Sequence, residues 1–197
     1  MATRAFDLVA ASLGLLVLAP LFVVIALLIR LGSPGPALFR QERVGLHGRP
    51  FRIYKFRTMH QDAEAVGGQL TVGGDRRITP VGAFLRRFKI DELPQLINVV
   101  RGEMALVGPR PEVPRYVAHY DARQRAVLAV RPGITDPASI EFSAENELLQ
   151  ASGDPEATYL HEVMPTKLAM NLSYLERRTL RSDIGVILAT LRRIAGV

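Results

Sequence analysis

Hydrophobic positions along the chain form one long block, followed by shorter segments that mix apolar and polar residues. Residues 8–31 read LVAASLGLLVLAPLFVVIALLIRL, and the only charge among them is Arg30. A helix of this length, rising about 1.5 Å per residue, could cross a hydrocarbon core of roughly 30 Å. The block is too long for a secretory signal peptide, and no A-x-A-like cleavage site precedes Arg30. The pattern therefore predicts a membrane helix.

Two features of this helix argue against a simple crossing. Pro20 lies near its middle, where proline removes a backbone hydrogen bond and bends the axis. Arg4 and Arg30 flank the two ends, so the tendency of positive charge to stay cytoplasmic favours neither direction of crossing. A re-entrant helix that bends at Ala19-Pro20 and returns would keep both arginines on one side. On these grounds a plain span and a re-entrant helix are both open.

The segment that follows predicts a small β-hairpin. Residues 32–36, GSPGP, form a stiff turn that ends the membrane helix. Two extended runs follow at 37–44 and 51–59, and the Gly- and Pro-containing stretch 45–50 joins them. Residues 60–78 are polar and Gly-rich, which predicts a loop and a candidate mobile lid.

Local signals place two helices next. Thr79-Pro80 combines an N-cap residue with proline at the first helical position. The helix over 81–89 interleaves apolar and basic residues, so it could lie on a membrane surface or pack on a core. A second helix is predicted from Asp91 to about Arg101, with Gly102 as its stop.

The remainder of the chain predicts further helices. A short strand over 104–107 leads to the Pro-braced stretch Gly108-Pro109-Arg110-Pro111. Helices are predicted at 112–130 and at 155–178, the latter interrupted at Pro165. A last helix from an N-cap at Ser182 to Ile194 has an apolar face that suits a core or a membrane surface. The fold class is α+β, mostly helical, with the membrane helix at 1–31 and one integrated domain at 32–197.

Composition narrows the chemistry. The chain has no cysteine, which excludes thiol catalysis and disulfides, and its four histidines lack the HExxH spacing of zinc hydrolases. The net charge is +6, and residues 1–60 alone carry eight Arg/Lys against two acidic residues. A positive excess beside an apolar segment suggests a surface held against anionic headgroups or phosphates. The alternative is a merely basic protein or one that binds nucleic acid.

The adjacent carboxylates Asp91 and Glu92 are the candidate reactive groups. If Asp91 caps its helix and Glu92 lies in the first turn, both lie at the positive end of the helix dipole. That environment favours the ionised form that a nucleophile or a Mg²⁺ ligand needs. The alternative is that both are simple caps.

Basic residues surround these carboxylates in the sequence. Arg86 lies about one helical turn upstream, and Arg110 lies downstream between two prolines. Arginines around carboxylates suit a metal-bridged diphosphate. Lys55 and Arg57 could join them, or they could form a solvated basic strand face.

Taken together, these segments resemble the bacterial sugar transferase family, the monotopic polyprenyl-phosphate phosphoglycosyl transferases. The resemblance rests on FRQERVGLHGRPFRIYKFRTM (39–59), DRRITPVGAFLRRFKIDELPQLINVVRGEMALVGPRP (75–111) and RPGIT (131–135) in this order. It implies a re-entrant helix bent at Ala19-Pro20, where the family usually has serine before the proline, and amphipathic surface helices around an active site.

The resemblance also implies a mechanism. Asp91 would attack the β-phosphate of a nucleotide diphospho-sugar, and polyprenyl phosphate would then take the phospho-sugar from Asp91. Glu92 would act as acid/base or organise the metal. Mg²⁺ would neutralise the diphosphate, with Asp91 as its protein ligand. Arg86, Arg110 and the Pro109-Arg110-Pro111 motif match positions that contact phosphate or nucleotide.

The implied partners are a nucleotide-sugar, with UDP suggested by small members, undecaprenyl phosphate and membrane lipid, with no nucleic acid. The implied location is the cytoplasmic face of a bacterial inner membrane. After Thr135 the match thins, which leaves the sugar open, and the chain resembles a minimal catalytic unit. Two other hypotheses are a non-catalytic membrane-surface adaptor that binds anionic lipid or nucleic acid, and an aspartyl-phosphate phosphatase.

Overall fold

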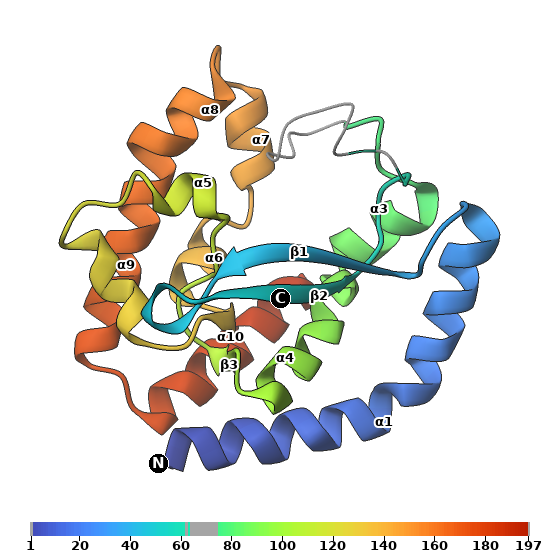
Figure 1. The fold of residues 1–197 in the computed structure, drawn as a ribbon, viewed down its shortest axis with the longest axis horizontal. Helices are drawn as coiled ribbons and strands as arrows, with labels where there is room; N and C mark the ends of the chain where they lie inside the picture. Colours follow the sequence, from blue (N-terminus) through green and yellow to red (C-terminus); the bar gives the residue numbers. More distant parts are fainter. Residues whose placement is uncertain (1, 62, 64–74, 197) are drawn as a thin grey trace.

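The computed structural model describes residues 2–61, 63 and 75–196. The fold is a mostly helical α+β arrangement, as the sequence predicted (Figure 1). In chain order its elements are α1 Ala2–Gly32, β1 Leu38–Val44, η1 Leu46–Gly48, β2 Pro50–Phe56, α3 Pro80–Arg87, η2 Ile90–Gln95, α4 Leu96–Arg101, β3 Ala105–Val107, α5 Pro114–Val117, η3 Gln124–Ala129, β4 Gly133–Thr135, α6 Pro137–Glu141, α7 Glu145–Gln150, α8 Pro155–Thr158, η4 Tyr159–Val163, α9 Met164–Glu176 and α10 Leu180–Ala195.

Helix α1 is bent into two arms, and both arms contact the rest of the chain (Figure 1). In the first arm, Arg4 donates to the carbonyl of Val99 at 2.8 Å, and Ala11 is fully buried beside α4. In the second arm, Ile25 and Ile29 pack into a cluster with Phe56 and Leu85. Pro20 lies between the two arms and accounts for the bend, because its ring cannot donate the helical hydrogen bond.

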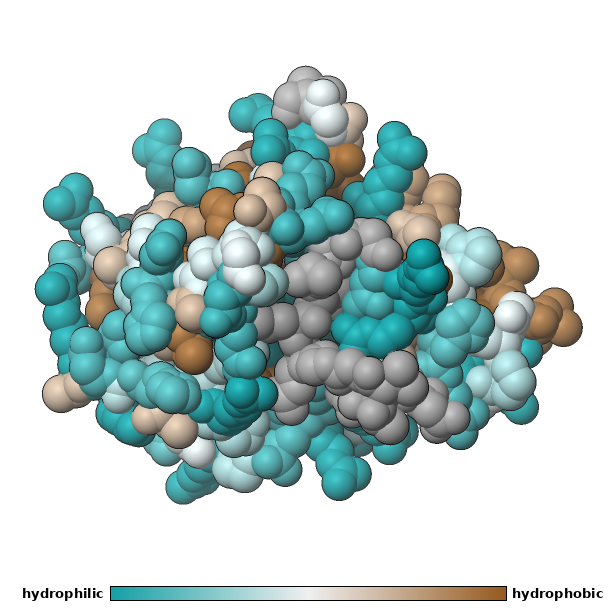
Figure 2. Space-filling view, turned by 90° about the horizontal axis from the view of Figure 1, so that it is seen from above, coloured by the Kyte–Doolittle hydropathy of each residue, from teal (hydrophilic) through white to brown (hydrophobic). Residues whose placement is uncertain are grey.

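The side of α1 that faces away from the domain is apolar. Eleven large hydrophobic residues of α1 are exposed, and Leu16, Val17 and Leu31 are more than 70% exposed. Figure 2 shows a largely hydrophilic face with hydrophobic side chains collected at the edge where the second arm of α1 lies. By length and hydropathy α1 is the one described helix that could cross a membrane. So much exposed apolar surface indicates a membrane-associated element.

The hairpin and the helices behind it form the centre of the molecule. Strands β1 and β2 pair antiparallel with Leu38 opposite Phe56 and Val44 opposite Pro50, close to the predicted runs. Thr79 caps α3 by accepting from the Gly82 amide at 3.0 Å, with Pro80 at the first position, as predicted. Helix α4 ends at Gly102, whose φ of 83° is the left-handed conformation expected of a helix-ending glycine.

A second core lies under the C-terminal helices. It gathers apolar residues of α5, η3, η4 and α9, including Val117, Val127, Val163 and Leu168. The predicted strand before the Gly108–Pro111 stretch is present as β3, and it pairs in parallel with β4. That pairing joins segments some 28 residues apart, counted from Ala105 to Gly133, and no sequence signal pointed to it.

Three helix predictions need correction. The predicted continuous helix over 112–130 is wrong: only the short α5 and η3 form there, separated by a turn. The last helix begins earlier than predicted, because Thr179 is its N-cap and Ser182 is the third residue of a capping box. The helix predicted over 155–178 is not interrupted at Pro165, which lies in the first turn of α9; the irregular segment is the π-helical turn η4, just before it.

The predicted loop over 60–78 lies mostly outside the described residues. Its described end includes Ile78, which forms an isolated antiparallel bridge with Met59. Arg77 and Asp75 pair through their side chains at 2.6 Å.

Candidate active site

Asp91 and Glu92 are presented by an abrupt change of direction between α3 and η2. Lys89 links the two helices with φ of 54°, the left-handed conformation that non-glycine residues rarely adopt. It is Lys89, and not Asp91, that occupies the N-cap position of η2. The hypothesis that Asp91 caps its helix is therefore wrong, and the side chain is available for another role. Both carboxylates are 7% exposed.

Glu92 is held by two cations. Its Oε1 accepts from Nζ of Lys55 at 2.8 Å, and its Oε2 accepts from Nη1 of Arg110 at 3.1 Å. Nη2 of Arg110 also donates to Oε1, so the arginine contact is bidentate. Burial alone would raise the pKa of Glu92, but Arg110 and Lys55 hold that pKa well below its usual range. Glu92 is therefore a fixed anion.

Asp91 has the opposite environment. Its Oδ1 is buried and accepts no hydrogen bond from the residues that the structure describes. Burial raises the pKa of Asp91, the neighbouring Glu92 raises it further, and Lys55, Arg86 and Lys89 act in the other direction. A buried carboxylate oxygen without a partner is unusual, because its desolvation is uncompensated. Such an atom is free to bind a cation or to attack an electrophile.

Arg86 approaches this pair from α3. Its Nε donates to the hydroxyl of Thr58 at 2.8 Å, and its charge acts on Asp91. Close packing makes this approach possible: a Cβ on Gly82 would meet the carbonyl oxygen of Thr58 at 2.0 Å. Any side chain at this position would push α3 away from the segment after β2.

Arg57 lies in a different setting from the other predicted site residues. Its guanidinium contacts the turn after α1, where Nη2 donates to the Ser33 carbonyl at 2.8 Å and Nη1 donates to the Pro34 carbonyl. Nη2 also contacts the Ser33 hydroxyl at 3.0 Å. The structure therefore brings Lys55, Arg86 and Arg110 to the two carboxylates and ties Arg57 to the end of the membrane helix.

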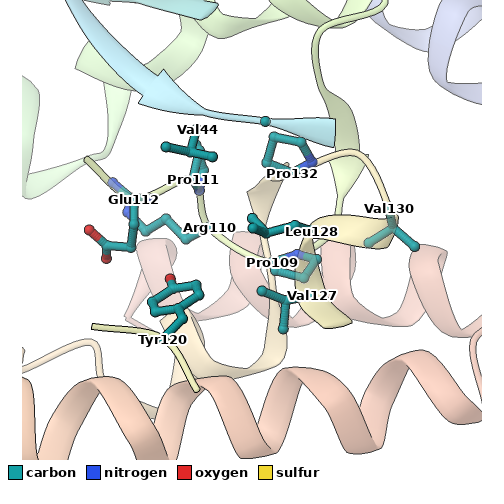
Figure 3. A pocket seen from close by; sticks show the side chains of 11 residues that line it. Val44, Pro109, Arg110, Pro111, Glu112, Tyr120, Val127, Leu128, Val130 and Pro132 are labelled. Atoms are coloured by element: carbon teal, nitrogen blue, oxygen red, sulfur yellow. The ribbon is translucent and has the colours of Figure 1, made fainter. Parts of the chain in front are cut away.

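The stretch Pro109-Arg110-Pro111 follows β3 as a braced loop. The Gly133 amide donates to the Pro109 carbonyl at 3.0 Å, and Nη1 of Arg43 donates to the Pro111 carbonyl at 3.3 Å. Figure 3 shows both prolines lining a small pocket together with Val44, Tyr120, Val127, Leu128, Val130 and Pro132. The loop is thus fixed on both sides of the arginine that binds Glu92.

Sequence reasoning missed the residues that hold this arrangement together. Asn98 is fully buried in α4, and its side chain binds the Tyr54 amide at 3.0 Å and the Arg52 carbonyl at 2.8 Å. It thereby fixes β2, and with it Lys55, against α4. Its one signal was a polar residue inside the apolar run Leu96–Val100. Thr58 orients Arg86, and nothing in the sequence pattern indicated this role.

The arrangement suits a divalent cation bound chiefly by substrate. No cluster of three or more His, Cys, Asp or Glu residues exists among the residues that the structure describes. Mg²⁺ is commonly held by one or two carboxylates together with substrate phosphates. The unpartnered Oδ1 of Asp91 fits that requirement.

Oδ1 of Asp91 has no partner among the described residues, and three cations, Lys55, Arg86 and Lys89, act on this carboxylate. Together with the long apolar helix, this layout is expected of an enzyme that transfers a phosphoryl-containing group at a membrane surface. The comparisons agree with this class. The family model for bacterial sugar transferases matches residues 1–196, so the chain belongs to that family.

Named relatives give the family's activities. A UDP-glucose:undecaprenyl-phosphate glucose-1-phosphate transferase of Caulobacter vibrioides is 42% identical over 95% of this chain and 67% of its own length. A UDP-N-acetylgalactosamine-undecaprenyl-phosphate N-acetylgalactosaminephosphotransferase of Aeromonas hydrophila is 37% identical over 97% of this chain and 43% of its own length. The exopolysaccharide production protein ExoY of Rhizobium meliloti is 34% identical over 97% of this chain and 84% of its own length. The chain thus spans about two thirds of the first relative and less than half of the second.

Proposed function

We propose that this protein transfers a sugar-1-phosphate from a UDP-sugar to undecaprenyl phosphate at a membrane surface. The observation that carries the proposal is the unpartnered Oδ1 of Asp91, buried next to the cluster of Glu92, Lys55 and Arg110. Family membership supports the reaction class, and the relatives of Caulobacter vibrioides and Aeromonas hydrophila are named for this donor type and this acceptor.

The proposed reaction has two displacements at one phosphorus. In the first, a carboxylate oxygen of Asp91 forms a bond to the β-phosphorus of the donor. The bond from that phosphorus to the bridging oxygen breaks, and UMP leaves with the electron pair. In the second, an oxygen of undecaprenyl phosphate attacks the same phosphorus, and the bond to Asp91 breaks. The carboxylate is regenerated, and the product is undecaprenyl diphospho-sugar.

The two acidic residues have different roles in this proposal. Glu92 is ionised and fully engaged by Lys55 and Arg110, so it is a poor proton donor or acceptor. Its function is to order the two cations that neutralise the diphosphate. Oδ1 of Asp91 accepts no hydrogen bond from a described residue, and the raised pKa of Asp91 makes it a stronger nucleophile once it is ionised. Asp91 is therefore the nucleophile, and Glu92 organises the site.

Mg²⁺ is the cofactor we propose, with Asp91 as its protein ligand. When bound, it supplies positive charge that stabilises the diphosphate and the departing phosphate. Arg86 and Arg110 are the residues of this chain that contact phosphate oxygens, since a guanidinium offers two parallel donors to a phosphate.

The position of α1 supports a re-entrant membrane helix. Both arms dock on the same domain, through Arg4 and Ala11 on one side of Pro20 and through Ile25 and Ile29 on the other. A straight crossing would separate one arm from the domain and expose its packing surface. In the bent form the exposed apolar residues enter the lipid while the carboxylates stay at headgroup height. We place the domain on the cytoplasmic face, where nucleotide-sugars are made.

The test is a transfer screen with the purified chain in nanodiscs that contain undecaprenyl phosphate. A panel of radiolabelled UDP-sugars is supplied with Mg²⁺, and label in the lipid phase is counted. We expect transfer with one or a few donors and none after chelation of the metal. Glu42→Gln, at an exposed site on β1, is the matched carboxylate control and should retain full activity.

A second measurement separates the two displacements. Without acceptor lipid, the enzyme should release UMP in a burst close to one equivalent per molecule. Release of no UMP, together with full transfer when acceptor is added, would replace the covalent route with direct displacement. No transfer from any donor and no thermal stabilisation by Mg²⁺ with UDP would favour a non-catalytic membrane adaptor.

A further inference from the structure

A buried set of polar contacts joins the C-terminal helices to the loop that carries Arg110. Tyr159, the first residue of η4, is 3% exposed and donates its hydroxyl to Oε1 of Glu112. Oε2 of Glu112 lies 3.7 Å from Nη1 of Arg43 on β1. The same nitrogen of Arg43 donates to the Pro111 carbonyl. The contacts therefore run from η4 to the residue that follows Arg110.

The backbone of this loop is fixed as well. The Val44 amide at the end of β1 donates to the Glu112 carbonyl at 2.9 Å. On the other side of Arg110, the Gly133 amide holds the Pro109 carbonyl. The backbone on both sides of Arg110 is therefore held, and the Glu112 carboxylate is one of the charges that act on the Arg110 guanidinium.

The charges around Glu112 make its hydrogen bond to Tyr159 important. Arg43 and Arg110 both feel the Glu112 charge, and the two arginines act on each other. The Glu112 side chain is 14% exposed, so it needs partners within the protein. The Tyr159 hydroxyl satisfies one oxygen without adding charge, and it leaves Arg110 free to reach Glu92. Without that hydroxyl, the carboxylate would gain more by drawing in a guanidinium.

Tyr159 itself is rigidly placed. Its ring packs on Tyr116 with centroids 5.0 Å apart, and Nζ of Lys167 lies 5.9 Å from the ring centroid. Lys167 is in turn paired with Glu145 at 2.7 Å. The residue opens a π-helical turn, and π-turns are uncommon and recur at functional sites.

We propose that Tyr159 is a positioning residue that, through Glu112, sets the orientation of Arg110 toward Glu92 and the donor diphosphate. This assigns a role to the C-terminal part of the chain beyond Thr135, which the sequence left without one. The proposal rests on the proposed function only where Arg110 is said to bind the donor.

The kinetic test uses Tyr159→Phe, which keeps the ring and removes the hydroxyl. We expect kcat/KM for the UDP-sugar to fall about tenfold, because small misplacements of a binding group are costly. Tyr116→Phe, which removes a hydroxyl from the partner ring of the same core, is the control and should retain activity. In an Arg110→Ala background, Tyr159→Phe should cost almost nothing more. An equal loss in both backgrounds would mean a general structural role and would overturn the proposal.

A second test needs no substrate, so it remains valid if the transfer reaction is not the function. Phenylglyoxal modifies guanidinium groups, and peptide mass spectrometry gives the rate at each arginine. In Tyr159→Phe, modification of Arg110 should become about threefold faster as its contacts loosen, while Arg86 should keep its rate. Glu112→Gln should give the same change if the Phe variant fails to fold. Unchanged Arg110 rates in both variants would overturn the proposal.

Discussion

Two buried aspartates from different parts of the molecule have opposite environments. Asp183, in the first turn of α10, is 3% exposed; Asp91, in η2, is 7% exposed. Asp183 accepts from the Tyr174 hydroxyl at 2.5 Å and from two nitrogens of Arg178 at 3.0 Å. Arg178 also donates to the Val107 carbonyl on β3. Asp183 thus ties α10 to the sheet, whereas Asp91 accepts no hydrogen bond at Oδ1 from a described residue.

The difference shows how to tell a carboxylate with a structural role from one with a catalytic role in this fold. A buried carboxylate that has all its partners has its desolvation compensated, and it has no free oxygen to offer a substrate. A buried carboxylate that lacks them, while cations stand nearby, raises the energy of the folded state and is ready for a ligand. Asp183 has the first role, and we assign the second to Asp91.

The largest expected effect is on catalysis. Asp91→Asn should reduce transfer by at least about 10⁴-fold, because an amide cannot form the acyl-phosphate bond. The measurement is label transfer to lipid, with Asp183→Asn corrected for folded fraction as the comparison. Substantial transfer by Asp91→Asn would remove the nucleophile assignment.

The second expected effect is on stability, and here the larger loss is at Asp183. Asp183→Asn should lower the free energy of unfolding by about 3 kcal/mol, because Arg178 would be left buried without its counter-charge. Denaturant titration followed by circular dichroism measures this change. If Asp183→Asn lowers the free energy of unfolding by no more than the exposed substitution Glu42→Gln, the Tyr174–Arg178–Asp183 contacts do not stabilise α10.

The third prediction concerns Glu92. Its carboxylate has hydrogen-bond partners, as that of Asp183 has, but it lies next to Asp91 in η2. Glu92→Gln should cost about 2 kcal/mol of stability near neutral pH, because Lys55 and Arg110 lose their shared anion. Since the pKa of Glu92 is lowered on folding, its contribution is present above the usual glutamate pKa of about 4.3 and is lost as pH falls through the lowered value.

Stability curves against pH test this directly. The wild type and Glu92→Gln should differ most near neutral pH and converge in acid. A constant difference across the acid range would show that the charge of Glu92 does not contribute to folding.

The smallest expected effect is a gain in stability. The pKa of Asp91 is raised on folding, so the ionised side chain costs stability as pH rises through the folded value. Asp91→Asn removes that cost and should stabilise the protein by about 1 kcal/mol at neutral pH. The gain should vanish below the unfolded aspartate pKa of about 3.9. Thermal unfolding at the two pH values measures it, and a loss of stability at neutral pH would contradict the unpaired state of Asp91.

The features that local chemistry dictates could be predicted from the sequence. Thr79-Pro80 starts α3, and Gly102 ends α4, because capping and left-handed backbone depend on residues within one turn. The hairpin follows from two extended runs joined by a turn. Asp91 and Glu92 could be named as candidates on other grounds, because they are adjacent carboxylates with arginines nearby in the sequence and lie in a motif that resembles the family.

Features that depend on long-range packing could not be predicted. Lys89 adopts a left-handed conformation although neither glycine nor asparagine stands there, so the N-cap of η2 was assigned to Asp91 instead. The side chain of Arg57 points to the turn after α1, while the neighbouring Lys55 reaches Glu92. Side chains two residues apart on a strand are expected on the same face, so the sequence did not indicate that Lys55 and Arg57 have different partners.

Covalent attachment of the phospho-sugar to Asp91 is tested by intact-protein mass spectrometry of enzyme mixed with its donor and Mg²⁺ and quenched in acid before acceptor lipid is added. We expect a mass increase equal to one phospho-sugar, located on the peptide that contains Asp91 and absent from Asp91→Asn. Undiminished transfer by an enzyme that never carries this adduct, or an adduct that persists in Asp91→Asn, would contradict it.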